Sequence, residues 1–386
     1  MKILYHHRIA SKDGQYVHIE ELTHALKSLG HEIIMVGPNL GEGRDAKVER
    51  RSVALLKRYM PRFLYELMEF AYSLFAYRRL QKTIMAQHPD CIYERYNLFM
   101  PAGVWASRRH KLPFLLEINA PLYEERSRYS GIALSRLALW SEEYTWRGAD
   151  RALVVTRVLA ERVRARGVDP AAIVVIPNGI DMDKFSNVPD IRVAKDELGL
   201  GGRVVLGFVG YMREWHGLER VVDLLSDVSE TRHLLLVGDG PARLSLERRA
   251  RELGVADRLT ITGIVAREKI AEYIAAFDVA IQPDVVDYAS PLKLFEYMAA
   301  GRAIVAPDKP NITEVLKHEY NALLFDPVDD QAFSSAVKRL CEDPALRKRL
   351  SEAARGTILD RGYTWKENAK RVSDLFLELA TKHCSS

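Results

Sequence analysis

The segment that begins at Ser290 combines the signals of a helix start with charged side chains. Ser290 suits the position before a helix, Pro291 suits the first helical position, and Gly301 suits the end. These residues predict a helix over 291–300. Because the first amides of a helix have no partner within it, a helix start attracts anions, and Lys293 adds a positive charge there.

Glu296 follows Lys293 by three residues, so both side chains share one face of the predicted helix. We expect the backbone amides of Leu292 and Lys293 to bind the phosphates of a nucleotide. Glu296, one turn further along, would accept hydrogen bonds from ribose hydroxyls. The alternative is a surface Lys–Glu pair with no ligand.

A second segment, 208–217, joins a predicted strand to a helix. Gly210 lets the backbone approach a ligand closely, and the Arg213 guanidinium can bind two phosphate oxygens at once. His216 either assists Arg213 at the phosphates or caps and packs at the start of the helix. We therefore expect Gly210 and Arg213, with His216 as an open case, to face the same ligand as Lys293.

Two segments of the N-terminal half suggest further contacts. In the segment 11–18, Gly14 would bring backbone amides toward a diphosphate or sugar, unless it serves only the geometry of the turn. Glu117 and Asn119 end a buried apolar run and lie on the same side of an extended chain. They bind the sugar or the acceptor, or else they cap the next helix.

The elements that position these residues alternate between strand and helix along all 386 residues, a length that allows two domains. Continuous apolar runs alternating with helical patterns are typical of parallel sheets covered on both faces. Before the turn at 177–179, the predicted strands are 3–5, 33–36, 91–93, 114–117, 152–155 and 173–176. After it, they are 204–209, 234–237, 259–261, 279–282 and 303–306.

The sequence thus predicts an α/β protein with two Rossmann-like, doubly wound parallel-sheet domains that face a central cleft. We expect the first domain at 1–187 and the second at 188–364. An apolar stripe in 365–386 predicts a last helix that packs back toward the first domain.

Composition limits the class of protein further. The net charge of +4 is too small for a typical nucleic-acid binder. The three cysteines are far apart and lack metal-binding spacing, so we expect no zinc site and no disulfide framework, and a reducing, cytoplasmic location.

A cluster of basic residues flanks a short apolar stretch, 70–77. Two interpretations remain open: a core helix with solvated ends, or a basic amphipathic helix resting on anionic lipid at the inner face of the cell membrane. The basic residues are Arg50, Arg51, Lys57, Arg58 and Arg62 before the stretch, and Arg78, Arg79 and Lys82 after it.

Several short segments together resemble the retaining glycosyltransferases of the GT-B fold, often called family four. They are Gly-His-Glu-Ile at 30–33, Ile-Pro-Asn-Gly-Ile-Asp at 176–181, Val-Gly-Asp-Gly-Pro at 237–241 and the helix that carries Glu296. The resemblance covers nearly the whole chain. Tyr-Glu-Arg-Tyr at 93–96, with the segment 116–122, resembles one bacterial branch of that family.

This resemblance implies a nucleotide-diphosphate sugar as donor, transfer with retained anomeric configuration, and no cofactor or required metal. Arg213 and Lys293 would neutralise the leaving diphosphate. Glu296 matches the second glutamate of the family's Glu-x7-Glu motif, which is expected at the ribose, and the base would pack near Val265. No nucleophile for a double displacement stands out, so the resemblance implies attack on the face that the leaving group occupies.

The chain departs from the family pattern at two places. Tyr288 stands where the first glutamate of the motif belongs, and Asp287 is one position away, so either residue would contact the donor sugar. His216 stands where a lysine is common. The acceptor would be a hydroxyl of a glycan, a polysaccharide, a lipid-linked glycan or a small metabolite.

Two other functions compete with sugar transfer. A sugar-nucleotide epimerase shares the fold, and a non-catalytic glycan- or nucleotide-binding subunit would keep the fold without turnover. The sequence disfavours a dehydrogenase, because Arg243 stands where a dinucleotide fingerprint needs its third glycine.

Overall fold

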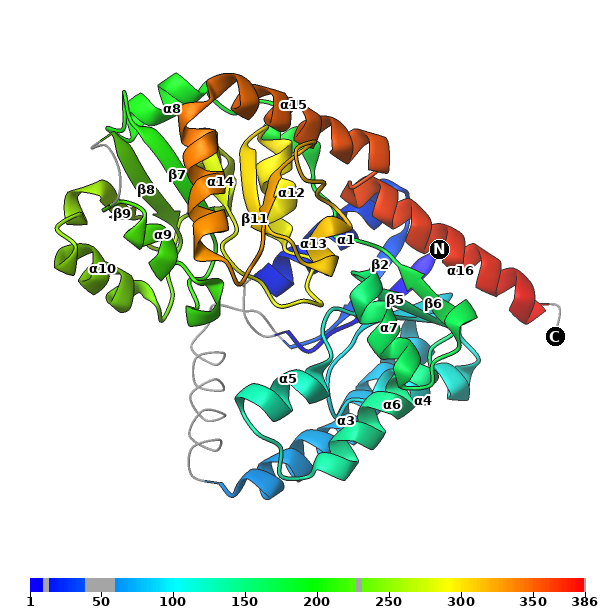
Figure 1. Ribbon diagram of the computed structural model, residues 1–386. Helices are drawn as coiled ribbons and strands as arrows, with labels where there is room; N and C mark the ends of the chain where they lie inside the picture. The colour runs from blue at the N-terminus through cyan, green and yellow to red at the C-terminus, as the bar shows by residue number, and fades with distance from the viewer. Residues whose placement is uncertain (10–13, 39–59, 227–230, 385–386) are drawn as a thin grey trace. The chain divides into compact units, whose positions relative to one another are not determined.

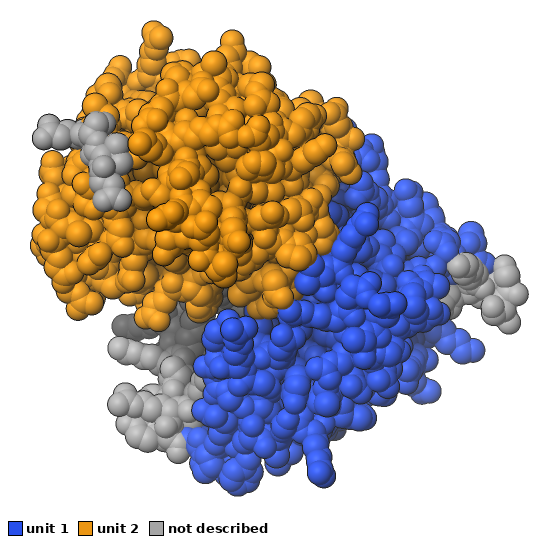
Figure 2. Space-filling view, in the orientation of Figure 1, with its two compact units in different colours: residues 1–177, 366–386 blue, residues 178–365 orange. Residues whose placement is uncertain are grey.

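A computed structural model describes residues 1–9, 14–38, 60–226 and 231–384 of the chain. It divides into two compact units, coloured separately in Figure 2. Unit 1 comprises Met1–Pro177 and Lys366–Ser386, and unit 2 comprises Asn178–Trp365. None of the helices in the described part of the chain combines the length and the apolar composition needed to cross a bilayer.

Unit 1 is built on a six-stranded parallel sheet with the order β2-β1-β3-β4-β5-β6. Strands are added on one side of β1 and then on the other, so the order reverses between β1 and β3, where such sheets bind ligands. The strands are β1 (Lys2–His6), β2 (Glu32–Val36), β3 (Cys91–Arg95), β4 (Phe114–Ile118), β5 (Arg151–Val154) and β6 (Ile173–Val175).

Helices cover the sheet of unit 1, and the strands β3 and β4 are buried along their whole length. That burial explains their continuous apolar runs. The helices are α1 (Gly14–Ser28), α3 (Arg62–Gln87), α4 (Ala102–His110), α5 (Leu122–Tyr129), α6 (Ser135–Arg147), α7 (Arg157–Ala165) and α16 (Trp365–Cys384), most of them labelled in Figure 1.

Unit 2 repeats this plan with the order β12-β11-β10-β7-β8-β9, all parallel, and reverses between β7 and β10. Its strands are β7 (Val204–Val209), β8 (Arg232–Val237), β9 (Leu259–Ile261), β10 (Val279–Ile281), β11 (Ala303–Pro307) and β12 (Leu323–Phe325). The predicted class, two Rossmann-like parallel-sheet domains, is confirmed. The short strand β12 is the one that the apolar pattern missed in this unit.

Two hydrophobic layers sandwich the sheet of unit 2. One contains residues of α11, α12 and α15, and the other contains residues of α9, α10 and α14. Figure 1 shows α14 lying across the sheet. The helices are α8 (Ile191–Glu197), α9 (Glu219–Asp223), α10 (Arg243–Glu252), α11 (Ile270–Ala275), α12 (Leu292–Ala299), α13 (Pro310–Thr313), α14 (Asp330–Glu342) and α15 (Pro344–Arg361).

The chain passes from unit 1 to unit 2 between Pro177 and Asn178, earlier than the predicted boundary at residue 187. The polar residues after the turn are not a linker, because unit 2 already holds them. The Ile180 amide donates to the Tyr363 carbonyl at 3.0 Å, and the Phe185 side chain is buried in the core of unit 2. From Lys366 onward, the last helix belongs to unit 1.

Candidate functional site

The N-terminus of α12 in unit 2 brings two of the predicted site residues together. Lys293 extends beneath the loop that follows β7, and its Nζ lies 3.8 Å from the centre of the Phe208 ring. A Cβ added to Gly210 would lie 3.4 Å from the same nitrogen, and Gly210 has a φ of +126°. A glycine is therefore needed here for its backbone conformation, whereas a Cβ would only come into ordinary van der Waals contact with Lys293.

Burial governs the charge of Lys293. It lowers the pKa of the ammonium from its usual value to about 7, and the carboxylate of Glu296 opposes this only in part. Glu296 is itself partly buried, one turn further along α12. Because Lys293 and Arg213 form no ion pair with any residue that the structure describes, an anionic ligand would supply the missing counter-charge.

Arg213 and His216 lie on the short turn η3 (Glu214–His216) after β7 and its loop. The exposed guanidinium of Arg213 stacks over the rings of Tyr211 and Trp215, with its Cζ 5.0 Å and 4.7 Å from their centres. These rings orient the guanidinium while leaving its N–H groups to a ligand.

His216 caps this turn, as one of the two interpretations expected. Its Nδ1 accepts the backbone N–H of Arg213 at 3.2 Å. Burial, together with the charges of Lys293 and Arg213, lowers the pKa of His216 to about 3. A neutral ring that accepts at Nδ1 carries its proton on Nε2, so His216 still has one hydrogen-bond donor to offer.

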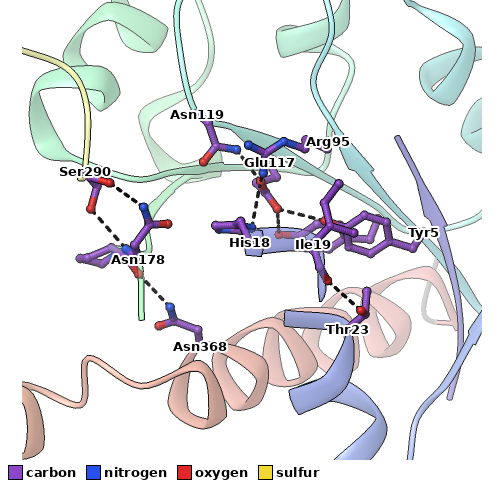
Figure 3. Close-up of polar contacts among 12 residues, drawn as sticks. Tyr5, His18, Ile19, Thr23, Arg95, Glu117, Asn119, Asn178, Ser290 and Asn368 are labelled. Carbon is purple, nitrogen blue, oxygen red and sulfur yellow. Dashed lines mark hydrogen bonds and ion pairs between the residues drawn. The ribbon is translucent and has the colours of Figure 1, made fainter. Parts of the chain in front are cut away.

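Ser290 differs from its predicted role. The helix begins at Leu292, and no side chain caps it among the described residues. Instead, the backbone N–H of Asn178 lies 3.4 Å from the Ser290 Oγ, and the Asn178 side chain donates to the Ser290 carbonyl at 2.6 Å (Figure 3). The hydroxyl is thus engaged by Asn178. Gly301, with a φ of +60°, follows the end of the helix as predicted.

The two candidates for the donor-sugar contact have different environments. The Asp287 side chain is exposed, whereas the Tyr288 side chain is buried. The loop that carries them is held by Lys309, whose Nζ donates to the Asp284 carboxylate at 2.5 Å, and by Asn311, which donates to the Ala289 carbonyl at 2.7 Å. Asp287 is thus the more accessible of the two.

The glycines of the segment 237–241 support the loop after β7, a role that the sequence did not reveal. A Cβ at Gly238 would overlap the Gly210 carbonyl oxygen, and one at Gly240 would overlap that of Met212. Backbone hydrogen bonds join the same segments, including Met212 N–H to the Asp239 carbonyl at 2.9 Å. Val265, predicted at the base, is partly buried against the core.

A second polar cluster lies in unit 1 around Glu117, at the end of β4. The parallel register places Arg95 of β3 directly opposite Glu117. The buried Glu117 carboxylate accepts hydrogen bonds from Arg95 and Asn119, from the Tyr93 hydroxyl at 2.7 Å and from the Tyr5 hydroxyl at 3.4 Å (Figure 3).

His18 of α1 completes this cluster, with its Nδ1 3.4 Å from Glu117 Oε1. Burial alone would raise the pKa of the Glu117 carboxyl, but the neighbouring His18 and Arg95 and the hydrogen bonds from Tyr93 and Asn119 lower it. Burial lowers the pKa of His18, and the nearby Glu117 carboxylate opposes this shift.

The Glu117 cluster rules out one interpretation of Glu117 and Asn119. No side chain caps α5, the next helix, among the described residues, and Asn119 bonds to Glu117 instead. Sequence reasoning missed Arg95, His18, Tyr5 and Tyr93. The signal for Arg95 was an arginine and a glutamate at the ends of two buried runs.

Two other predictions concern residues at the margin of what the structure describes. Gly14 is the first residue of α1, while 11–13 lie outside the described residues, so its contact with a ligand stays a prediction.

In the described part of the chain, no three His, Cys, Asp or Glu side chains are grouped as a metal site would require. The expectation of metal-independent chemistry also stays a prediction.

Two parallel α/β units in one chain, with a cationic helix start at the reversal point of the second sheet, define a protein of the two-domain Rossmann-like class. Residues 13–179 match the family model of the glycosyl transferase 4-like domain, and residues 190–357 match that of glycosyl transferases group 1. The chain belongs to the GT-B glycosyltransferases of the group 1, family four type.

Curated relatives carry the same activity class. The chain is 26% identical to the alpha-D-kanosaminyltransferase of Streptomyces kanamyceticus over 72% of this chain and 73% of the relative. It is 27% identical to a D-inositol 3-phosphate glycosyltransferase of Xylanimonas cellulosilytica over 76% of this chain and 72% of the relative. The protein is therefore a glycosyltransferase.

Solved structures with low sequence identity share the fold. Sucrose-phosphate synthase of Thermosynechococcus elongatus has a TM-score of 0.78 at 20% identity, covering 99% of this chain and 100% of that chain. Anabaena HepE in complex with UDP has a TM-score of 0.75 at 18% identity, covering 98% of this chain and 100% of that chain.

Proposed function

We propose that this glycosyltransferase takes a sugar from a nucleotide-diphosphate donor and transfers it to a hydroxyl acceptor with retention of anomeric configuration. The observation that carries the donor assignment is the convergence of the α12 N-terminus, Lys293 and Gly210 at the reversal point of the unit 2 sheet. The UDP complex of HepE supports UDP as the first nucleotide to test.

In this proposal, the diphosphate lies at the first turn of α12. The amides of Leu292 and Lys293, with the Lys293 ammonium and the Arg213 guanidinium, balance the negative charge that develops as the sugar leaves. The neutral His216 donates from Nε2 to a phosphate oxygen. This arrangement neutralises the leaving group without a metal ion.

The rest of the donor follows from the same placement. Glu296 accepts hydrogen bonds from the ribose hydroxyls, the base packs near Val265, and Asp287 contacts the sugar because its side chain is exposed in the described structure. Glu117 is already engaged by Arg95 and by hydroxyl donors, so we assign it to holding Asn119, which binds sugar or acceptor.

For the reaction itself, the acceptor hydroxyl attacks the anomeric carbon on the face from which the diphosphate departs. The bond from that carbon to the diphosphate oxygen breaks as the new glycosidic bond forms. A donor phosphate oxygen takes the hydroxyl proton. Because the acceptor attacks the anomeric carbon directly, the reaction needs no enzyme nucleophile. We place this reaction in the cytoplasm, during glycan or glycolipid synthesis.

Calorimetric titration with UDP, GDP and the matching monophosphates tests the donor assignment. A diphosphate should bind much more tightly than its monophosphate, because the α12 site acts on the second phosphate. Equal affinity for both would contradict the proposal. Turnover of a bound nucleotide-sugar, followed by NMR of the first anomer formed, tests retention; an inverted first product would overturn it.

A further inference from the structure

The helix α3 exposes its large apolar side chains instead of burying them. Among the described residues, Phe63, Leu67, Leu74 and Phe75 each expose 50% or more of their surface, and the nearby Leu64 and Met68 expose 41% and 44%. We call this set the α3 apolar face. The prediction that this stretch is a core helix with solvated ends is therefore wrong.

The opposite face of α3 is buried although it carries polar residues. Glu66 accepts the Leu134 N–H at 2.6 Å, and the Ser73 hydroxyl donates to the Phe99 carbonyl at 2.6 Å. These buried bonds fix the rotation of the helix about its axis. The α3 apolar face is therefore held outward by specific contacts on the other side.

The spacing of the exposed residues makes one continuous stripe. Residues 63, 67 and 74, and residues 64, 68 and 75, follow the three- and four-residue steps that align side chains on a helix. Trp140 of α6, exposed by 45%, packs edge-on against Phe70 beside this stripe, with ring centres 6.0 Å apart. A contiguous apolar surface of this kind is a mark of contact with a partner or a membrane.

Charge identifies the partner. Arg78, Arg79 and Lys82 continue the stripe, are exposed, and form no ion pair with any described residue. The acidic residues of α3 do not offset them, since Glu66 is buried and Glu69 is paired with Arg126 at 2.7 Å. The exposed side of α3 thus combines apolar residues with basic residues that no acidic residue of the helix offsets. Helices that lie on anionic lipid have this composition.

We propose that α3 docks this protein onto an anionic membrane surface, with the α3 apolar face in the acyl boundary and the Arg78–Lys82 end at the lipid phosphates. Arg50, Arg51, Lys57 and Arg58 lie outside the described residues and carry no part of the argument. The proposal is independent of the donor site, because α3 belongs to unit 1 and the α12 site to unit 2.

Sedimentation of the full chain with vesicles tests this docking. Vesicles of phosphatidylcholine containing phosphatidylglycerol should bind the protein, with an affinity that falls as salt is raised, while pure phosphatidylcholine vesicles should bind far less. Arg78→Ala with Lys82→Ala should weaken binding about 25-fold, because each basic residue near such a surface contributes about fivefold. Leu74→Ser with Phe75→Ser should weaken it at least tenfold.

Matched controls lie on α10 of unit 2, where Leu244 is 76% exposed and the Arg248 side chain is 70% exposed. Leu244→Ser and Arg248→Ala should leave vesicle binding unchanged. Absence of binding to anionic vesicles overturns the proposal, as do equal losses in the controls. If Leu74→Ser with Phe75→Ser dissociates a dimer or lowers the melting temperature without affecting lipid binding, protein covers the face and the proposal is wrong.

A second inference concerns Asn178, the first residue of unit 2, and rests on the proposed donor site. Its side chain is buried, and its one recorded hydrogen bond among the described residues goes to the Ser290 carbonyl. That carbonyl belongs to the peptide that leads into α12. We infer that Asn178 is a positioning residue, which aims the first amides of α12 at the diphosphate.

Asn368 provides a matched control for Asn178. It is also buried, and it donates to the Pro177 carbonyl at 2.8 Å (Figure 3), a bond within unit 1 that does not involve Ser290. Both Asn178→Ala and Asn368→Ala remove one buried hydrogen bond. Only the first removes a bond to the start of α12.

Calorimetric titration with UDP or GDP, whichever the wild type binds, separates the two variants. Asn178→Ala should weaken binding about threefold to tenfold, the effect of one misplaced hydrogen-bonding group, and Asn368→Ala should leave binding unchanged. Equal losses, or no loss in Asn178→Ala, overturn the inference. A wild type that binds no nucleoside diphosphate would instead refute the proposed donor site.

Discussion

The Glu117 cluster of unit 1 and the α12 site of unit 2 handle buried charge in opposite ways. Glu117 is saturated: Arg95 lies against it, and Tyr93, Tyr5 and Asn119 donate to it. Lys293 has no such partner, and burial lowers its pKa to about 7. The charge of Glu117 is neutralised by residues of the fold, whereas we expect a ligand to neutralise the charge of Lys293.

This contrast teaches which site is structural support and which is a binding site. A saturated buried ion pair costs stability when one member is removed, since the other charge stays buried alone. A partly buried lysine whose charge is only partly compensated costs stability while it is present, and it contributes only when an anion binds. The two sites should therefore respond to neutralising mutations with opposite signs in stability.

The largest effect should come from Glu117→Gln. This variant leaves the Arg95 guanidinium buried without its counter-charge, and it should lower the free energy of unfolding by about 3–5 kcal/mol. Urea unfolding followed by circular dichroism measures the change. The control is Glu319→Gln, which removes an exposed ion pair with Arg339 and should alter stability little. A similarly small loss of unfolding free energy in both variants would contradict the structural role of the Glu117 cluster.

Lys293→Met should lower the kcat/KM for the donor about 100-fold to 1000-fold, the range for removing one group that stabilises the leaving charge. Its stability should stay equal or rise, since no buried ammonium remains. The stability cost of Lys293 is largest below pH 7 and is relieved as the pH rises from about 7 toward the value of an ordinary lysine. A variant that unfolds more easily at pH 6 than the wild type would show that Lys293 is structural.

Donor-site affinity should also depend on pH. As the pH rises above about 7, Lys293 of the free protein loses its proton, so nucleoside diphosphate binding should weaken by up to about tenfold per pH unit. Lys293→Arg should remove this dependence because a guanidinium keeps its charge. Titration calorimetry between pH 6.5 and 9 measures it. A wild type and a Lys293→Arg variant with parallel profiles would assign the titration to another group.

The smallest effect is expected at His216. His216→Ala removes the acceptor of the Arg213 N–H and should weaken diphosphate binding about threefold to tenfold. Asn can accept the same bond but places no donor where Nε2 lies, so His216→Asn separates the two roles. Full recovery of affinity in His216→Asn would make His216 a cap only; continued loss would make it a phosphate ligand as well.

The sequence predicted the two parallel sheets because a buried strand has a continuous apolar run, and this run is visible whichever strands pair with it. It also predicted that Gly210 and Lys293 would face the same ligand, and the structure brings them close together because both follow strands at the reversal of the unit 2 sheet. The short strand β12 was missed because three apolar residues, Leu323–Phe325, make no distinctive run.

Contacts made by strand pairing or by distant turns could not be predicted from local patterns. Arg95 opposes Glu117 only because β3 and β4 are neighbours in that register. Ser290 was expected to cap α12 on local propensity, but its hydroxyl lies against the amide of Asn178, far away in sequence. The rotation of α3 was likewise set by buried bonds of Glu66 and Ser73 that its composition does not reveal.

The central claim is that the Lys293 ammonium lacks a full counter-charge in the free protein and gains one when a diphosphate binds. NMR of the lysine side chains tests this claim most directly. In protein labelled with ¹³C at lysine, one resonance should titrate near pH 7, be absent from Lys293→Met, and move to a pKa above 9 when UDP or GDP is bound. A Lys293 resonance that titrates like an ordinary lysine, or that is indifferent to saturating diphosphate, would contradict the account.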